Sequence, residues 1–247
     1  MKKEKILDFY KSASDTILAR YQIKYFPVGI KFLKEREDTF GFLRTKQRKS
    51  ICAFLKIAAR GESFYVDEDA ISCPGGLRWM GFSSKLTETY FYKYFLGEVE
   101  KIKESPDIAE KFLNFLPQPP KEGTYQKIIF GPIKNFHFHP DVIVLISVPR
   151  FAYQIITDAY LDEYHLLKII PICAACHGVI SIPFTTGELN FSFIDSMSRK
   201  LGSYKNDEVL IGIPCARFLS LMENIKKLPK KNIKQAVIAK IIKKMID

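Results

Sequence analysis

Hydrophobic residues recur at helical spacing in several segments of the chain. In residues 4–21 the apolar side chains fall on one face, and Ser50 can cap a second helix that Gly61 ends. The same spacing predicts further helices over residues 86–96, 107–116, 149–159, 215–225 and 232–246. The pattern therefore predicts helices from the start of the chain to its basic end.

Short apolar runs between these segments predict β-strands. Residues 141–148 give the clearest one, because an apolar run of this kind is typical of a strand buried on both faces. Other strands are predicted over 28–33, 63–66, 127–130, 189–194 and 209–213. The mixture predicts one α+β or α/β domain over residues 1–225, with a central sheet and flanking helices. Residues 226–247 are predicted to form a basic amphipathic helix that packs on this domain or on a partner.

The composition is typical of a folded protein. The 247 residues are 47% hydrophobic and 13% aromatic, which is enough for one substantial core. Charged residues interrupt the first segment, so it does not resemble a signal peptide. No apolar run is long enough to span a membrane. We therefore expect a cytoplasmic protein.

The formal net charge is +11, and much of it lies near the end of the chain. Eight lysines occur between Lys226 and Lys244. Such a surface attracts nucleic acid or anionic lipid, so one alternative function is a metal-free binding module. The simpler interpretation is a helix whose apolar side packs on its own domain or on a second subunit, which leaves a homo-oligomer open.

The five cysteines are Cys52, Cys73, Cys173, Cys176 and Cys215. Cysteines of cytoplasmic proteins rarely form lasting disulfides, so thiol chemistry, metal binding or simple burial must explain them. Cys215 opens an amphipathic helix, where packing is the simpler role. The other four deserve separate consideration because of their neighbours.

Cys73 is followed by Pro74, Gly75 and Gly76, which predict an irregular loop with exposed backbone amides. Amides directed at a sulfur lower the pKa of the thiol, and Gly75 and Gly76 would let a cofactor approach the main chain. Cys73 is therefore a candidate metal ligand. A further alternative function is a thiol-dependent enzyme with Cys73 as the nucleophile.

The sequence Cys173-Ala-Ala-Cys176-His177 has three interpretations. It matches the attachment motif of c-type haem, although attachment normally needs export. It could form a dithiol redox pair. It could also be half of a metal site whose remaining ligands come from the other cysteines, and His177 could join that site.

The remaining histidines point less clearly to function. His137 and His139 alternate with Phe136 and Phe138, which predicts a strand with both imidazoles on its solvated face. His165 follows acidic residues at a predicted helix end, where a capping role suffices. No catalytic triad, phosphate-binding glycine loop or dinucleotide fingerprint is present.

Several short motifs follow one another in a distinctive order. Their residues are Pro27, Val28, Cys52, Cys73, Gly75, Gly76, 140–144, Cys176, Pro183, Thr186, Gly187, Asn190, Ser192, Arg199, Asp207, Glu208, Ile213 and Pro214. In this order they resemble the uncharacterised family called domain of unknown function 169, over most of residues 27–225.

The resemblance implies a set of separated cysteines, here Cys52, Cys73 and Cys176, often with a fourth near the position of Asp195. Three thiolates and the Asp195 carboxylate suit an iron–sulfur cluster or zinc, and a metal-free protein is the other alternative. The leading hypothesis is a metal or iron–sulfur protein that acts on a small-molecule substrate or exchanges electrons with a redox partner. Whether it is an enzyme stays open.

Overall fold

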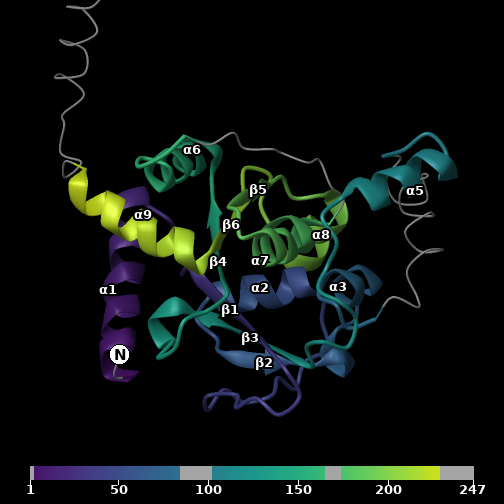
Figure 1. The fold of residues 1–247 in the computed structure, drawn as a ribbon, viewed down its shortest axis with the longest axis horizontal. Helices are drawn as coiled ribbons and strands as arrows, with labels where there is room; N and C mark the ends of the chain where they lie inside the picture. The colour runs from purple at the N-terminus through teal and green to yellow at the C-terminus, as the bar shows by residue number, and fades with distance from the viewer. Residues whose placement is uncertain (1–2, 84–101, 165–173, 229–247) are drawn as a thin grey trace, which may run out of the picture.

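A six-stranded antiparallel sheet runs through the centre of the molecule (Figure 1). The computed structural model describes residues 3–83, 102–164 and 174–228. The strands lie in the order β2-β3-β1-β4-β6-β5. They are β1 (Val28–Leu33), β2 (Phe64–Val66), β3 (Lys127–Pro132), β4 (Val142–Ser147), β5 (Asn190–Ser192) and β6 (Val209–Pro214). The structure confirms a mixed α+β fold built on one central sheet.

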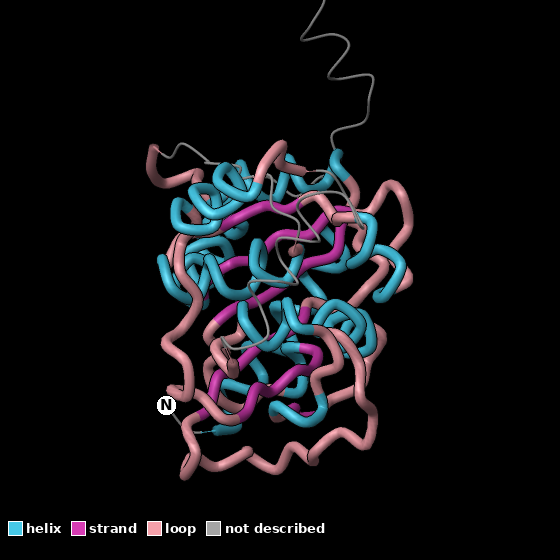
Figure 2. The backbone as a smooth tube through the Cα atoms, turned by 90° about the vertical axis from the view of Figure 1, so that its right-hand side faces the viewer, coloured by secondary structure: helices cyan, strands magenta, loops and turns pink. Residues whose placement is uncertain are grey.

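Helices cover both faces of the sheet, and Figure 2 shows the strands enclosed by them. One face carries α1 (Lys3–Tyr21), α6 (Pro149–Ala159) and α9 (Cys215–Lys227). The other carries α2 (Ile51–Ala59), α3 (Pro74–Trp79), α5 (Pro106–Phe115), the π-helix η3 (His177–Ser181), α7 (Ile182–Thr186) and α8 (Ser196–Gly202). Two short 3₁₀ turns, η1 (Glu68–Ala70) and η2 (Ile133–Asn135), complete the described elements.

Strand β4 shows how the sequence produces two cores. All six of its residues are buried, as the apolar run predicted. Because side chains alternate along a strand, Val142 and Val144 enter the core on the α2 side. Ile143 and Leu145 enter the core on the α1 side. The sheet therefore has a separate hydrophobic core on each of its two faces.

Two local predictions were wrong. Pro74–Trp79 forms helix α3, with Cys73 as its N-cap, and is not an irregular loop. Proline fits the first turn of a helix because that turn needs no N–H donor from it. Residues 136–141 follow η2 in an irregular segment and not in a strand, although Phe136 and Phe138 are buried as expected.

Other predictions fall partly or wholly outside the described residues. The predicted helices over 86–96 and 232–246 lie there, as do His165 and Cys173. The predicted domain boundary after residue 225 falls within α9, which continues to Lys227. In the described segments, no helix has both the length and the apolar character needed to cross a membrane.

One glycine fixes how η3 lies against the sheet. A Cβ atom on Gly212 of β6 would lie 2.1 Å from the backbone oxygen of Val179 in η3. No side chain fits in that space, so glycine at this position lets the backbone of the π-helix pack directly against the backbone of the strand. This contact holds η3, and with it the preceding Cys176, over the α2 face of the sheet.

Candidate thiol site

Cys52 lies in the first turn of α2. Ser50 caps this helix by accepting a hydrogen bond from the Ala53 amide at 3.2 Å. The Cys52 side chain is buried, and its thiol donates to the Ser198 hydroxyl of α8 at 3.2 Å. On the main-chain side, the Tyr204 hydroxyl donates to the Cys52 carbonyl at 2.9 Å. Cys52 is therefore held from both sides by the α8 region.

Cys73 caps α3 with its sulfur, which accepts a hydrogen bond from the Gly76 amide at 3.3 Å. A Cβ atom on Gly76 would lie 2.7 Å from that sulfur and 2.8 Å from the Ile51 side chain, so the sulfur's position requires glycine there. Gly75 is the second residue of the helix. Gly76 thus serves sulfur placement and helix packing. The approach of a cofactor to Gly75 and Gly76 stays a prediction.

The pKa of Cys73 differs from the sequence-based expectation. Burial raises the pKa of this thiol to about 11, and the neighbouring Cys52 raises it as well. The backbone amides of Ile51 and Gly76 lower the pKa, as predicted, but burial outweighs them. The thiol of the metal-free protein is therefore protonated at neutral pH.

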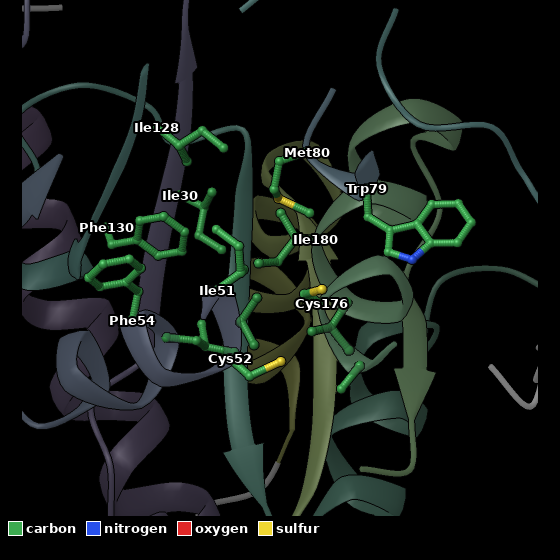
Figure 3. Packing of buried hydrophobic residues seen from close by; sticks show 14 of the residues in the cluster. Ile30, Ile51, Cys52, Phe54, Trp79, Met80, Ile128, Phe130, Cys176 and Ile180 are labelled. Atoms are coloured by element: carbon green, nitrogen blue, oxygen red, sulfur yellow. The ribbon is translucent and has the colours of Figure 1, made fainter. Parts of the chain in front are cut away.

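Cys176 immediately precedes η3 and is buried. Its pKa lies well above the usual value of a thiol. The causes, from the largest, are a hydrogen bond with Cys52, burial, and the charges of Cys52, Cys73 and Asp195. Figure 3 shows Cys52 and Cys176 in one buried region, close to Met80 and Ile180. The structure therefore brings Cys52, Cys73 and Cys176 together from three separate segments.

Asp195 is close to this cluster but is already engaged. One carboxylate oxygen accepts a hydrogen bond from the Ser198 amide at 2.8 Å, which caps α8. The other accepts one from the Ala175 amide at 3.1 Å. Asp195 therefore links α8 to the residue before Cys176, which is a positioning role that its place in the sequence did not reveal.

His177 is fully buried beside the thiols, and its ring stacks on Trp79 of α3 at a centroid distance of 3.6 Å. Burial, followed by the charge of Arg78, lowers the pKa of His177 to about 3, so the imidazole is neutral. The Pro117 carbonyl is near enough to favour the protonated ring slightly, but neither ring nitrogen has a well-formed hydrogen bond in the described structure. The ring joins α3 to η3 by stacking.

Cys215 does not belong to this cluster. It packs on the opposite face of the sheet, where Tyr10 lies 3.4 Å from its sulfur and His139 lies 3.9 Å away. Across the described ranges, no three His, Cys, Asp or Glu side chains are arranged so that they could hold a metal ion as they lie. The thiols of Cys52, Cys73 and Cys176 lie close together, and raised pKa values keep those of Cys73 and Cys176 protonated.

Comparison with known proteins places the chain in a family. The family model DUF169, described as uncharacterised ArCR, matches residues 16–224. The chain belongs to the DUF169 family. This confirms the resemblance seen in the order of the motifs. The chain is also 23% identical over 202 residues to uncharacterized protein MJ0308 of Methanocaldococcus jannaschii, covering 80% of this chain and 85% of that protein. No solved structure matches it.

Sequence reasoning missed the residues that support the thiols in this DUF169 protein. The Ser198 hydroxyl accepts a hydrogen bond from the Cys52 thiol, and the Tyr204 hydroxyl donates one to the Cys52 carbonyl. The ring of Tyr204 also lies 4.6 Å from the Lys56 ammonium, which is ion-paired with Glu208 at 2.7 Å. Lys56 lies on the apolar face of α2, one turn after Cys52. A lysine on an apolar helix face was the signal in the sequence from which a buried ion pair near Cys52 could have been predicted.

Proposed function

We propose that the protein holds a metal centre, most simply an iron–sulfur cluster, through the thiolates of Cys52, Cys73 and Cys176. The centre would serve redox or small-substrate chemistry. One observation carries this proposal: thiols from α2, α3 and the start of η3 share one buried region, where charge on one raises the pKa of another. Cys52 and Cys176 are buried and Cys73 is half-buried beside them, and thiolates in such a place are stable together only if a cation neutralises them.

The surroundings of the thiols suit metal-bound sulfur. The sulfur of Cys73 accepts hydrogen bonds from backbone amides. Such N–H donors stabilise the negative charge of a thiolate and tune the reduction potential of a cluster bound to it. Ile51, Met80 and Ile180 are buried around the cysteines and limit the access of water.

The ligand set that fits is three thiolates and not three thiolates with Asp195. Both Asp195 oxygens accept backbone amides, and losing those hydrogen bonds would uncap α8. Binding also requires the thiols to lose their protons and the side chains to reorient, because their present arrangement is not a coordination shell. A bound centre would supply an electron-transfer site or a metal position that an external molecule could occupy.

Anaerobic preparation of the full chain tests the proposal. We expect to find iron and sulfide in the protein, together with an absorption band in the near-ultraviolet and visible region. Cys52→Ser, Cys73→Ser and Cys176→Ser should each lose most of the bound metal. Cys215→Ser is the matched control, since it removes a thiol from the opposite face and should keep the metal. Circular dichroism of each variant establishes that it is folded.

A protein that stays free of metal after anaerobic incubation with iron and sulfide, or with zinc, would contradict the proposal. A second function is then favoured by the closeness of Cys52 and Cys176, since Cys52 is the largest cause of the raised pKa of Cys176. These two thiols could form a disulfide, releasing two protons and two electrons to an external oxidant such as a disulfide. Mass spectrometry after mild oxidation would show a Cys52–Cys176 cross-link and a loss of two mass units.

A further inference from the structure

Two adjoining cavities open on the side of the molecule where α1 ends and α6 begins. The first has a volume of about 200 Å³ and is bordered by the loop after α1, the end of β4 and the turn before β6. The second has a volume of about 520 Å³ and lies between α1, α6 and the end of α9. Gln22 and Phe151 line both, so the two cavities adjoin at these residues. Together they reach the size of a small-molecule site.

The charges around these cavities are mostly positive. Lys24 and Lys205 line the first, and Arg20, Arg150 and Lys226 line the second. Arg20 is ion-paired with Asp158 and Lys226 with Glu223. In the described part of the chain, Lys24, Arg150 and Lys205 have no ion-pair partner. Three exposed cations outside the described ion pairs therefore border the cavities.

The acidic residues of the first cavity do not cancel this charge. Glu208 accepts hydrogen bonds from the Lys56 ammonium at 2.7 Å and from the Lys205 amide at 2.8 Å. Lys56 neutralises it, and both side chains of that pair are almost completely buried. Asp207 is exposed at the rim of the cavity, as are Lys24, Lys205 and Arg150, and its charge offsets one of these three cations. The inner wall is electrically neutral, so the border of the two cavities keeps a net positive charge.

The wall between this cavity and the thiols is rigid. The Lys56 ammonium lies between two aromatic rings, 3.9 Å from the centroid of Tyr25 and 4.6 Å from that of Tyr204. Tyr25 lines the cavity, while Tyr204 reaches the Cys52 carbonyl on the other side. The cavity is therefore preformed by a packed polar layer and does not depend on a loop closing over it.

The start of α6 adds one hydrogen-bond donor at the junction of the cavities. Val148, its N-cap, offers no side-chain acceptor to the first turn of this 11-residue helix. Pro149 has no N–H, and the Phe151 amide donates to the Val148 carbonyl at 3.0 Å, so the Arg150 amide is the donor that remains in this turn. Val148 lines the first cavity and Arg150 the second, and the positive end of the helix dipole there favours a negatively charged group. Gln22 adopts a φ of 49°, which is rare for this residue type, at the same junction.

We propose that these cavities bind a small phosphate-bearing molecule, independently of any metal at the thiols. Its phosphate would lie between Lys24, Lys205 and Arg150, and an apolar or planar part would lie against Phe151. Three cations match a group that carries two or more negative charges, which favours phosphate over a single carboxylate. The concave shape favours a small ligand over a nucleic-acid backbone.

Calorimetric titration of the full chain tests this, with inorganic phosphate, pyrophosphate and adenosine diphosphate as probes at constant ionic strength. We expect saturable binding that strengthens from phosphate to pyrophosphate to adenosine diphosphate. Lys205→Ala and Arg150→Ala should each weaken the binding of pyrophosphate about fivefold, as expected for one partly exposed ion pair. Lys111→Ala is the matched control, because it removes the same charge from the exposed face of α5.

Two results would overturn the proposal. One is the absence of saturable binding for all three probes at millimolar concentration. The other is an equal weakening in Lys111→Ala, since that would show attraction by the net charge of the protein and not by a site. Thermal unfolding of each variant separates lost binding from lost folding.

Discussion

The buried ion pair between Lys56 and Glu208 gives the sharpest test of how this fold is stabilised. The Lys56 side chain is 2% exposed and that of Glu208 is 6% exposed, and their charged atoms are 2.7 Å apart. Replacing Glu208 with Gln keeps the shape but leaves the Lys56 charge without a counter-ion. Breaking a buried pair from one side typically costs about 3–5 kcal/mol. Two aromatic rings still contact the ammonium, so we expect the lower end, about 3 kcal/mol.

The consequences of Glu208→Gln are measurable by chemical and thermal unfolding. A loss of about 3 kcal/mol lowers the melting temperature of a chain of this size by roughly 6–12 °C. The double variant Lys56→Met/Glu208→Gln should recover much of this stability, because no buried charge remains. Lys111→Ala, which breaks the exposed pair with Asp107, should change stability by less than about 0.5 kcal/mol.

The pH dependence gives an independent check with a definite sign. Burial lowers the pKa of Lys56, and the ion pair with Glu208 opposes that effect. In Glu208→Gln the opposing effect is lost, so the folded state releases the Lys56 proton at a lower pH than the unfolded state does. Stability of the variant should therefore rise, relative to wild type, as pH increases through that lowered pKa. Equal unfolding midpoints for wild type and Glu208→Gln at pH 7 would refute the reasoning.

Three further predictions follow from other contacts. In metal-free protein, Cys73 should alkylate slowly at pH 7, because a pKa of about 11 leaves roughly one thiol in ten thousand ionised; rapid labelling by iodoacetamide, followed by mass spectrometry, would contradict this. Gly76→Ala should cost about 1–3 kcal/mol in denaturant unfolding, since its Cβ would overlap the Cys73 sulfur, and an unchanged midpoint would disprove it. Gly212→Ala should destabilise the protein more, because its Cβ would meet the rigid Val179 backbone 2.1 Å away; circular dichroism during heating measures the loss.

Local patterns predicted most of the secondary structure, including α2 with Cys52, but missed α3 and η3 next to the other two thiols. The long apolar segments became α1, β4 and α6 because periodicity and burial agree there. Helix α3 was missed because glycine and proline usually interrupt helices, and its cap is a cysteine sulfur, which is not a standard capping group. The π-helix η3 has no simple period to detect, and it depends on a long-range contact with Gly212.

The thiol site was predictable only in part, for a related reason. The resemblance to the family singled out Cys52, Cys73 and Cys176, and folding brings these three together. The partners that fix them come from one region beyond residue 194, where Ser198 and Tyr204 were not recognised and Asp195 was expected as a ligand, not as a helix cap. Each makes its contact across at least 20 positions of sequence, and no local pattern records such contacts. Spacing alone could not show that Asp195 caps a helix.

Tyr204 joins the two proposed sites physically, which affects how they should be tested. Its hydroxyl holds the Cys52 carbonyl, its ring covers Lys56, and its pKa is raised by burial and then by the charges of Cys52, Glu208 and Cys176. An anion beside Lys205 would therefore add negative charge near the thiols and oppose their ionisation. If the cavity is a separate site, Cys52→Ser should bind pyrophosphate as wild type does, even where it has lost its metal. Loss of both properties in Cys52→Ser, with the fold intact, would mean that the cavity and the thiols form one site.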